Sequence, residues 1–188
     1  SSPPLSPPSR LPRAGTLRWR SGQPRRPMTS NAITCAVEDN LVGMPGLANG
    51  AGEPRMAAAR ARVRMEAATL LRIREGGIGK GDVLAVARLA AIGGSKQTPA
   101  LIPLCHPVRL TAVDIRFTLD DALPGVIVDA RVEAHDRTGP DMEAMTAAST
   151  AALTIYDMCK AIDRGMTIEA VQLTEKNGGK SGSWRRSP

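Results

Sequence analysis

Hydrophobic and polar residues alternate in four parts of the chain, the pattern of strands with one buried face. These parts are residues 61–65, 113–119, 126–135 and 167–174. The second and third are separated by the turn-forming sequence DDALPG, so we predict that they form a hairpin. Residues 101–110 contain two prolines and are predicted to be mostly loop.

Apolar residues at helical spacing occupy the intervals between these strands. Residues 66–75 predict a short helix that stops at Gly76-Gly77. A second helix is predicted to start after Lys80-Gly81, with Asp82 as its N-cap or as an acid of its first turn, and to run through VLAVARLAAI until Gly93-Gly94 ends or loosens it. A long helix is predicted over residues 141–163. Strands interleaved with helices predict an α+β sandwich, with the helices on one face of the sheet.

The two ends of the chain lack such patterns. Residues 1–54 are predicted to be disordered or atypical, and 55–188 to be the folded domain, with the segment EKNGGKSGSWRR as a flexible tail. We predict a cytoplasmic location. Residues 1–30 lack acids, as organellar transit peptides do, so an organelle is the alternative location. A third interpretation is upstream sequence before a natural start near Met28.

The formal net charge of +7 suggests a nucleic-acid partner until the charge is located. Residues 1–37 hold six arginines and no acid, and the rest holds 19 basic and 18 acidic residues. Only the arginine-rich residues 1–37 therefore support a nucleic-acid binder, and we expect no nucleic-acid partner for the folded part. Three widely spaced cysteines fit a reducing compartment. The sequence contains no CxxC or HxxxH pattern, so we expect no structural zinc site. No apolar run approaches the ~20 residues that a membrane helix needs.

The long predicted helix carries Asp157 and Lys160 one turn apart on a single stripe. Two interpretations are open: a solvated ion pair, or a partly buried acid–base pair with tunable pKa values. Glu143 shares the stripe but lies 14 residues away, roughly 21 Å at helical rise, too far to hold one small group with Asp157.

His106 follows Cys105 in a proline-bounded loop, LCHP. An acid–base role, a ligand role and a merely hydrogen-bonded histidine are all open. Cys105 is less favoured as a nucleophile, because a Cys–His pair normally comes from separate segments. The segment GGKSG at 178–182 is not a P-loop, because Thr174 stands where that pattern requires glycine. A mobile terminus is the favoured interpretation there.

Five segments, in order over residues 55–186, resemble the molybdenum-cofactor biosynthesis protein C family, the cyclic pyranopterin monophosphate synthases. They are KGDVLAVARLAAI, LIPLCHP, DMEAMTAAS, AALTIYDMCKAIDRGMTI and EKNGGKSG. The resemblance implies a ferredoxin-like antiparallel sheet with helices on one face. It also implies a homohexamer, a trimer of dimers with active sites at the dimer interface. The implied activity is that of a lyase that converts 3′,8-cyclo-7,8-dihydroguanosine triphosphate to cyclic pyranopterin monophosphate and releases pyrophosphate.

The resemblance also assigns roles to residues of this chain, without a metal or a cofactor. It implies catalytic roles for Asp157, Lys80, Lys160 and His106, and a substrate-binding site lined by Leu104, Cys105, His106, Met142 and Glu143. We name Arg88 and Lys96, with Lys80, as cations for the triphosphate.

Two features depart from the family pattern. Asp141 stands where the family usually has glutamate, and the opening strand with its LTHxD…MVDVSxK pattern is not recognisable before Arg55. The alternative hypothesis is therefore a catalytically impaired family member that acts as an assembly subunit.

Overall fold

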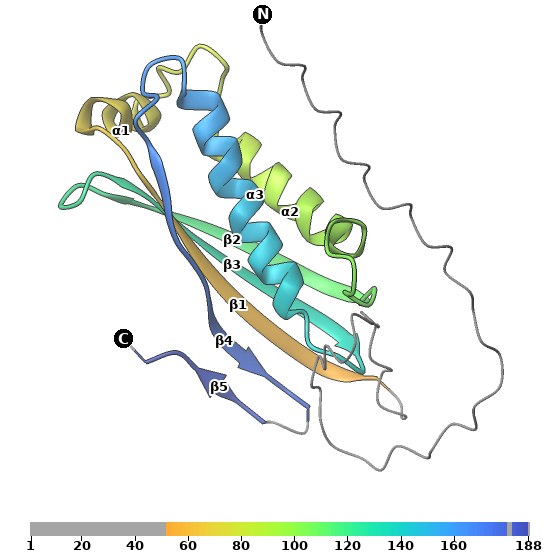
Figure 1. The fold of residues 1–188 in the computed structure, drawn as a ribbon. Coiled ribbons are helices and arrows are strands. Elements are labelled where there is room, and N and C mark those ends of the chain that lie inside the picture. Colours follow the sequence, from red (N-terminus) through yellow and green to blue (C-terminus); the bar gives the residue numbers. More distant parts are fainter. Residues whose placement is uncertain (1–51, 180–181, 188) are drawn as a thin grey trace, which may run out of the picture. The chain divides into compact units, whose positions relative to one another are not determined.

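The structure is a computed structural model that describes residues 52–179 and 182–187; the predictions for residues 1–51 lie outside this part. The strands are β1 (Glu53–Arg64), β2 (Leu110–Asp120), β3 (Gly125–Asp136), β4 (Thr167–Asn177) and β5 (Trp184–Arg185). The helices are α1 (Ala67–Arg74), α2 (Val83–Leu101) and α3 (Asp141–Cys159). The sheet order is β2-β3-β1-β4-β5, and every neighbouring pair is antiparallel (Figure 1).

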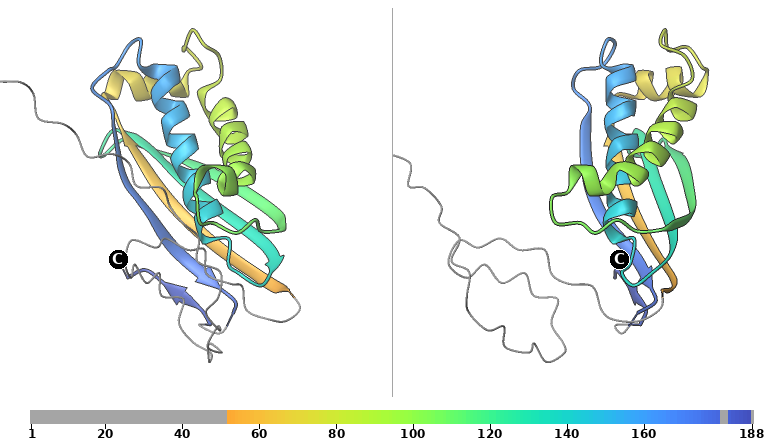
Figure 2. Two further views of the ribbon diagram at one scale, coloured as in Figure 1. Left: turned by 45° about the vertical axis from the view of Figure 1, so that its right-hand side comes forward. Right: turned by 90° about the vertical axis from the view of Figure 1, so that its right-hand side faces the viewer.

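All three helices lie on the same side of this sheet, as the right-hand view of Figure 2 shows. Strands β1 to β4 and the two long helices follow the ferredoxin-like arrangement, in which β1 and β3 occupy the centre. The expected α+β ferredoxin-like fold is therefore confirmed. The predicted hairpin is also confirmed, since β2 pairs with β3 on either side of the short turn.

Strand β1 is longer than the alternating segment at 61–65 that predicted it. Its inward positions from Ala57 to Val63 are buried against the helices, while Arg60 and Arg64 face the other side and pair with Asp129 and Glu169. Its first half was missed because alanines occupy both faces there and hide the alternation. Pairing with β3 and β4 on its two edges supplies the information that the local sequence lacks.

Helix α2 continues through Gly93-Gly94, so the predicted end at these glycines is wrong. A side chain at position 94 would place its Cβ 2.4 Å from Thr150 Oγ1, so glycine permits close contact between α2 and α3. That tertiary contact outweighs the low helix propensity of glycine. Near the end of α2, Pro99 cannot donate to Ser95 O, and Thr98 Oγ1 donates to that carbonyl instead at 3.0 Å.

The C-terminal half of the domain also differs from prediction at its boundaries. Helix α3 ends at Cys159, four residues before the predicted end, because the chain turns there and both Ile162 N and Asp163 N donate to Cys159 O. Strand β4 continues to Asn177 and pairs with β5, so the prediction of a flexible tail is wrong for these residues. Pairing between the two strands, which the local sequence does not reveal, extends β4 and forms β5.

The core consists of small aliphatic side chains, as the scarcity of aromatic residues suggested. Helix α3 contributes five fully buried alanines, Ala144, Ala147, Ala148, Ala151 and Ala152. Small side chains let α3 lie close to β1 and α2, which fixes the direction of its two ends. Within residues 52–179 and 182–187, no helix is both long and apolar enough to cross a bilayer.

Candidate active site

Three charged side chains meet where the last turn of α3 approaches the start of α2. Lys80 Nζ lies 2.8 Å from Asp157 Oδ2, and Lys160 Nζ lies 2.6 Å from Asp157 Oδ1. Lys80 Nζ also donates to Asp157 O at 2.9 Å. We call Lys80, Asp157 and Lys160 the charged trio. The structure thus brings together three of the four predicted catalytic residues, although 77 positions separate Lys80 from Asp157.

The charged trio is open to solvent and strongly polarised. About half of each side chain is exposed, 49% for Lys80, 56% for Asp157 and 53% for Lys160. Hydrogen bonds from Lys160 and then Lys80 lower the pKa of Asp157 to about 2, and Asp157 raises the pKa of Lys160. The pKa of Lys160 is therefore raised in the single chain. In the single chain, Asp157 is a carboxylate and Lys160 an ammonium at neutral pH.

A second cluster lies at the opposite end of α3. Glu143 is only 2% exposed, its Oε1 lies 3.8 Å from Cys105 Sγ, and its Oε2 has no hydrogen-bond partner among the described residues. Two residues earlier, Asp141 Oδ2 pairs with Lys176 Nζ at 2.9 Å, while the buried Asp141 Oδ1 has no partner among the described residues. We call Cys105, Asp141, Glu143 and Lys176 the buried-acid cluster. These two buried oxygens are exceptions to the rule that buried polar atoms are hydrogen-bonded.

Burial dominates the pKa values of Glu143 and Cys105 in this cluster. It raises the pKa of Glu143, and the nearby Asp141 charge adds to this effect. Burial, together with the Glu143 carboxylate, raises the pKa of Cys105 to about 11. The Cys105 thiol is therefore protonated at neutral pH, which argues against its acting as a thiolate nucleophile.

The loop between α2 and β2 and the first turn of α3 carry the remaining predicted substrate-binding residues. Leu104 and His106 are half-buried in this loop, and Cys105 N donates to Ile102 O at 3.0 Å in a tight turn. Met142, in the first turn of α3, is 39% exposed. The structure therefore places Leu104, His106 and Met142 at the same end of α3 as the buried-acid cluster and not beside the charged trio.

Lys176 is a member of the cluster that sequence reasoning missed. It belongs to β4 and is opposite Ala57 of β1, whose side chain is fully buried toward the helices. This register points Lys176 toward the first turn of α3. Lys176 falls in the predicted flexible tail. Two bulges in the pairing of β4 with β1 break the alternation between Ile168 and Lys176, so period-two counting along the local sequence does not reveal which side Lys176 faces.

Arg88, one of the cations expected near the triphosphate, is engaged elsewhere. Its guanidinium donates to Ile115 O and lies 5.3 Å from the centroid of the Phe117 ring. It thus secures α2 to the edge strand β2 and does not face the charged trio. Lys96 is exposed on the second half of α2.

The glycine-rich segment after β4 forms a turn between β4 and β5. Gly178, Gly179 and Gly182 have positive φ angles, and Gly182 N donates to Gly179 O at 3.0 Å. Gly179 has a φ of +81°, a left-handed conformation that favours glycine over residues with a side chain. Lys180 and Ser181 lie outside the described residues.

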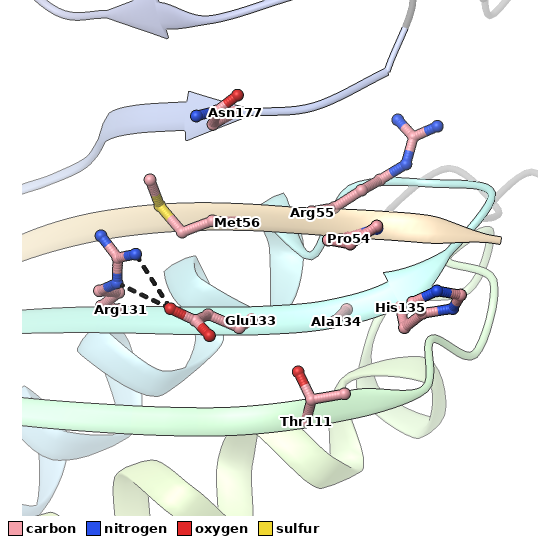
Figure 3. A pocket seen from close by; sticks show the side chains of 9 residues that line it. All are labelled: Pro54, Arg55, Met56, Thr111, Arg131, Glu133, Ala134, His135 and Asn177. Carbon is pink, nitrogen blue, oxygen red and sulfur yellow. Dashed lines mark hydrogen bonds and ion pairs between the residues drawn. The ribbon is translucent and has the colours of Figure 1, made fainter.

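The hollow drawn in Figure 3 is elsewhere, on the face of the sheet that the helices leave open. It has a volume of about 460 Å³ and is lined by residues such as Met56, His135 and Asn177, with Arg131 paired to Glu133. It contains no residue of the charged trio or the buried-acid cluster. We therefore place the candidate site at the two ends of α3 and not in this hollow.

The comparisons with known proteins cover the region that holds both clusters. The model of the MoaC family matches residues 47–179. A cyclic pyranopterin monophosphate synthase from Heliobacterium modesticaldum (strain ATCC 51547 / Ice1) is 56% identical over 132 residues, which cover 70% of this chain and 83% of that protein. The chain belongs to the MoaC family. The resemblance inferred from the sequence is thus confirmed.

MoaC family membership leaves one geometric problem at the candidate site. Glu143 and Asp157 are 14 residues apart on one continuous helix, which corresponds to roughly 21 Å. A single chain therefore does not bring the charged trio and the buried-acid cluster around one small ligand.

Proposed function

We propose that this chain is a cyclic pyranopterin monophosphate synthase, a lyase of molybdenum cofactor biosynthesis. Its substrate would be 3′,8-cyclo-7,8-dihydroguanosine triphosphate, and its products cyclic pyranopterin monophosphate and pyrophosphate. The observation that carries the proposal is the contact of Lys80 with both Asp157 and its backbone carbonyl, in a chain 56% identical to a protein of that name.

The chemistry of the two clusters suits this reaction. Opening and rebuilding the purine rings requires groups that move protons, and the buried Glu143 and the half-buried His106 are candidates. Forming the cyclic phosphate requires a substrate hydroxyl to attack phosphorus while the bond to the pyrophosphate leaving group breaks. Ammonium groups such as Lys80, Lys160 and Lys176 would stabilise the negative charge that develops on the phosphate oxygens.

We further propose that each active site forms between two copies of the chain. The charged trio of one protomer would then face the buried-acid cluster of its partner, which would supply partners for the orphan oxygens of Asp141 and Glu143. The outer surface of the helix layer between the clusters exposes Leu89 (70%) and Leu153 (58%), side chains that a second copy would cover. A closed homohexamer, a trimer of such dimers, is the assembly we propose.

The alternative of an impaired assembly subunit receives no support from the described residues. It rested on the unrecognised opening strand before Arg55, a stretch that lies almost wholly outside the described residues, whereas in the described sheet β1 pairs along both edges. We also propose that the enzyme acts in the cytoplasm, since Cys105 and Cys159 are free thiols, as is usual in a reducing compartment.

Activity and assembly are tested together by subunit complementation. Asp157→Asn and Glu143→Gln chains are prepared separately, each is assayed for pyrophosphate release from the cyclised substrate, and the two are then co-refolded. If sites are shared, each mixed dimer regains one intact site, and about a quarter of wild-type activity returns on random pairing. No release by the wild-type chain would refute the enzyme proposal. Two inactive variants without recovery on mixing would refute shared sites.

A further inference from the structure

The turn that follows α3 is held by one buried carboxylate outside the clusters described above, that of Asp163. Asp163 is 7% exposed, and its backbone N–H donates to Cys159 O at 3.1 Å. Its Oδ1 accepts a hydrogen bond from Gly165 N at 3.0 Å. The side chain therefore folds back into its own turn, and that turn includes Lys160.

The other oxygen of the carboxylate joins this turn to the start of α1. Asp163 Oδ2 accepts from Glu66 N at 2.9 Å and from Thr69 Oγ1 at 3.2 Å. Glu66 is the N-cap of α1, but its own side chain makes no capping hydrogen bond. Asp163 thus performs the capping function from 97 positions away and places a negative charge at the positive end of α1.

The two segments that Asp163 joins are those that lead to the charged trio. Asp157 lies in the last turn of α3, and Lys160 N donates to Tyr156 O at the C-cap, three residues before Asp163. On the other side, α1 ends at Arg74 and passes into the loop that carries Lys80. Because the trio side chains are half exposed, little packing holds them, and their separation depends on where these backbones lie.

Asp163 lies between a hollow and the packed end of α3. A hollow of about 470 Å³ lies beside the carboxylate and is lined by Thr69, Ile162 and Gly165 among others. The last turn of α3 is packed in the core through Ile155, Met158 and Cys159, so the hydrogen bonds of Asp163 act on the turn that follows this packed end.

We infer that Asp163 is a positioning residue, which holds the end of α3 against α1 so that Asp157 and Lys160 meet Lys80. This inference rests on the proposed function for its effect on turnover. It extends that proposal by a residue that touches no member of the charged trio in the contacts of the described chain.

The test uses the full chain and three graded changes, Asp163→Ala, Asp163→Asn and Thr69→Val. Asp120→Asn is the matched control, because Asp120 also accepts from two backbone N–H groups of a turn but lies in the β2–β3 turn. The first measurement is a ¹³C NMR titration of the Asp157 carboxyl, which needs no substrate. The second is kcat and KM for pyrophosphate release.

We expect Asp163→Ala to move the Asp157 pKa from about 2 toward its ordinary value of 3.8, because Lys160 and Lys80 no longer hold the carboxylate. We expect kcat to fall roughly 10–100-fold through misplacement of the trio, with KM changed less than about threefold. Asp163→Asn and Thr69→Val should give smaller changes in the same direction, and Asp120→Asn none.

An unchanged Asp157 titration in a folded Asp163→Ala protein would overturn the inference. If that variant does not fold, unchanged titrations in both Asp163→Asn and Thr69→Val would overturn it equally. A wild-type chain without pyrophosphate release would instead refute the proposed function, and the NMR titration would still decide whether Asp163 positions Asp157.

Discussion

The two ends of α3 carry carboxylates with opposite electrostatic character. Asp157 is exposed, and its two ammonium neighbours lower its pKa to about 2. Glu143 is buried, lacks a cationic partner among the described residues, and has a raised pKa. Charge pairing therefore sets the pKa of Asp157, whereas desolvation sets the pKa of Glu143.

This difference separates two kinds of chemistry. A carboxylate that remains ionised is suited to fixing cations beside a phosphate group and does not readily exchange a proton near neutral pH. A buried carboxyl with a raised pKa can carry a proton and deliver it. In the proposed enzyme, Asp157 would organise Lys80 and Lys160, while Glu143 would exchange protons with the ring system.

The largest effect is expected from Asp157→Asn, which keeps the shape of the side chain and removes its charge. If Asp157 organises the lysines, pyrophosphate release should fall by roughly 10²–10⁴-fold with the protein still folded. Adding Lys160→Ala should cost little more, because groups that act as a unit are not additive. Near-normal release by Asp157→Asn would show instead that the charged trio is an ordinary surface ion-pair cluster.

The next effect is expected from Glu143→Gln, which should reduce turnover about 10²-fold, the lower end of the range for a general acid or base, while stabilising the fold at neutral pH. A carboxyl whose pKa is raised by folding binds more protons in the folded than in the unfolded state. Stability is then lost as pH rises from its unfolded pKa to its folded pKa.

Glutamine does not titrate, so Glu143→Gln should unfold at a higher urea concentration than wild type at pH 7, and this gain should shrink toward pH 4. Urea titrations at both pH values measure the difference. A variant that is less stable at pH 7 would contradict the assignment of Glu143 as a buried acid with a raised pKa.

The sequence predicted the fold well where one segment contained its own signal. The alternation in β2 and β3 and the turn between them were sufficient for the hairpin. Gly94 was misleading because its role depends on Thr150, which lies on another helix. Trp184 was assigned to a tail because β5 exists only through pairing with β4.

The candidate site shows the same limit. Asp157 and Lys160 were identified by their spacing of three within one helix. Lys80 was identified through the family motif, since nothing local connects it to a residue 77 positions away. The pair of Asp141 and Lys176 was missed because it depends on the register of β4 against β1.

A smaller effect should appear in the acid stability of the charged trio. Folding lowers the Asp157 pKa from 3.8 to about 2, so its stabilising contribution is present above pH 3.8 and is lost as pH falls through 2. Wild type should therefore lose more stability than Asp157→Asn between about pH 4 and pH 2. Urea unfolding midpoints of wild type and Asp157→Asn, measured from pH 4 to pH 2, test this expected difference. Midpoints that fall in parallel for the two proteins would indicate that Lys80 and Lys160 do not hold the Asp157 carboxylate in solution.

The smallest effect on turnover is expected from Arg88→Met, which tests whether position in the fold, rather than charge alone, distinguishes the lysines of the trio. Arg88 lies on the helix that begins just after Lys80, but it is bound to Ile115 O and the Phe117 ring. Methionine keeps much of the aliphatic stem and removes the cation. Unfolding free energy should fall by about 1 kcal/mol with the lost cation–π contact and hydrogen bond.

Pyrophosphate release by Arg88→Met should change less than about threefold, whereas Lys80→Ala should lose about as much activity as Asp157→Asn, roughly 10²–10⁴-fold. A large loss of activity in Arg88→Met at wild-type stability would mean that Arg88 leaves β2 to bind the triphosphate. In that case the cationic site would extend along α2, beyond the end of α3.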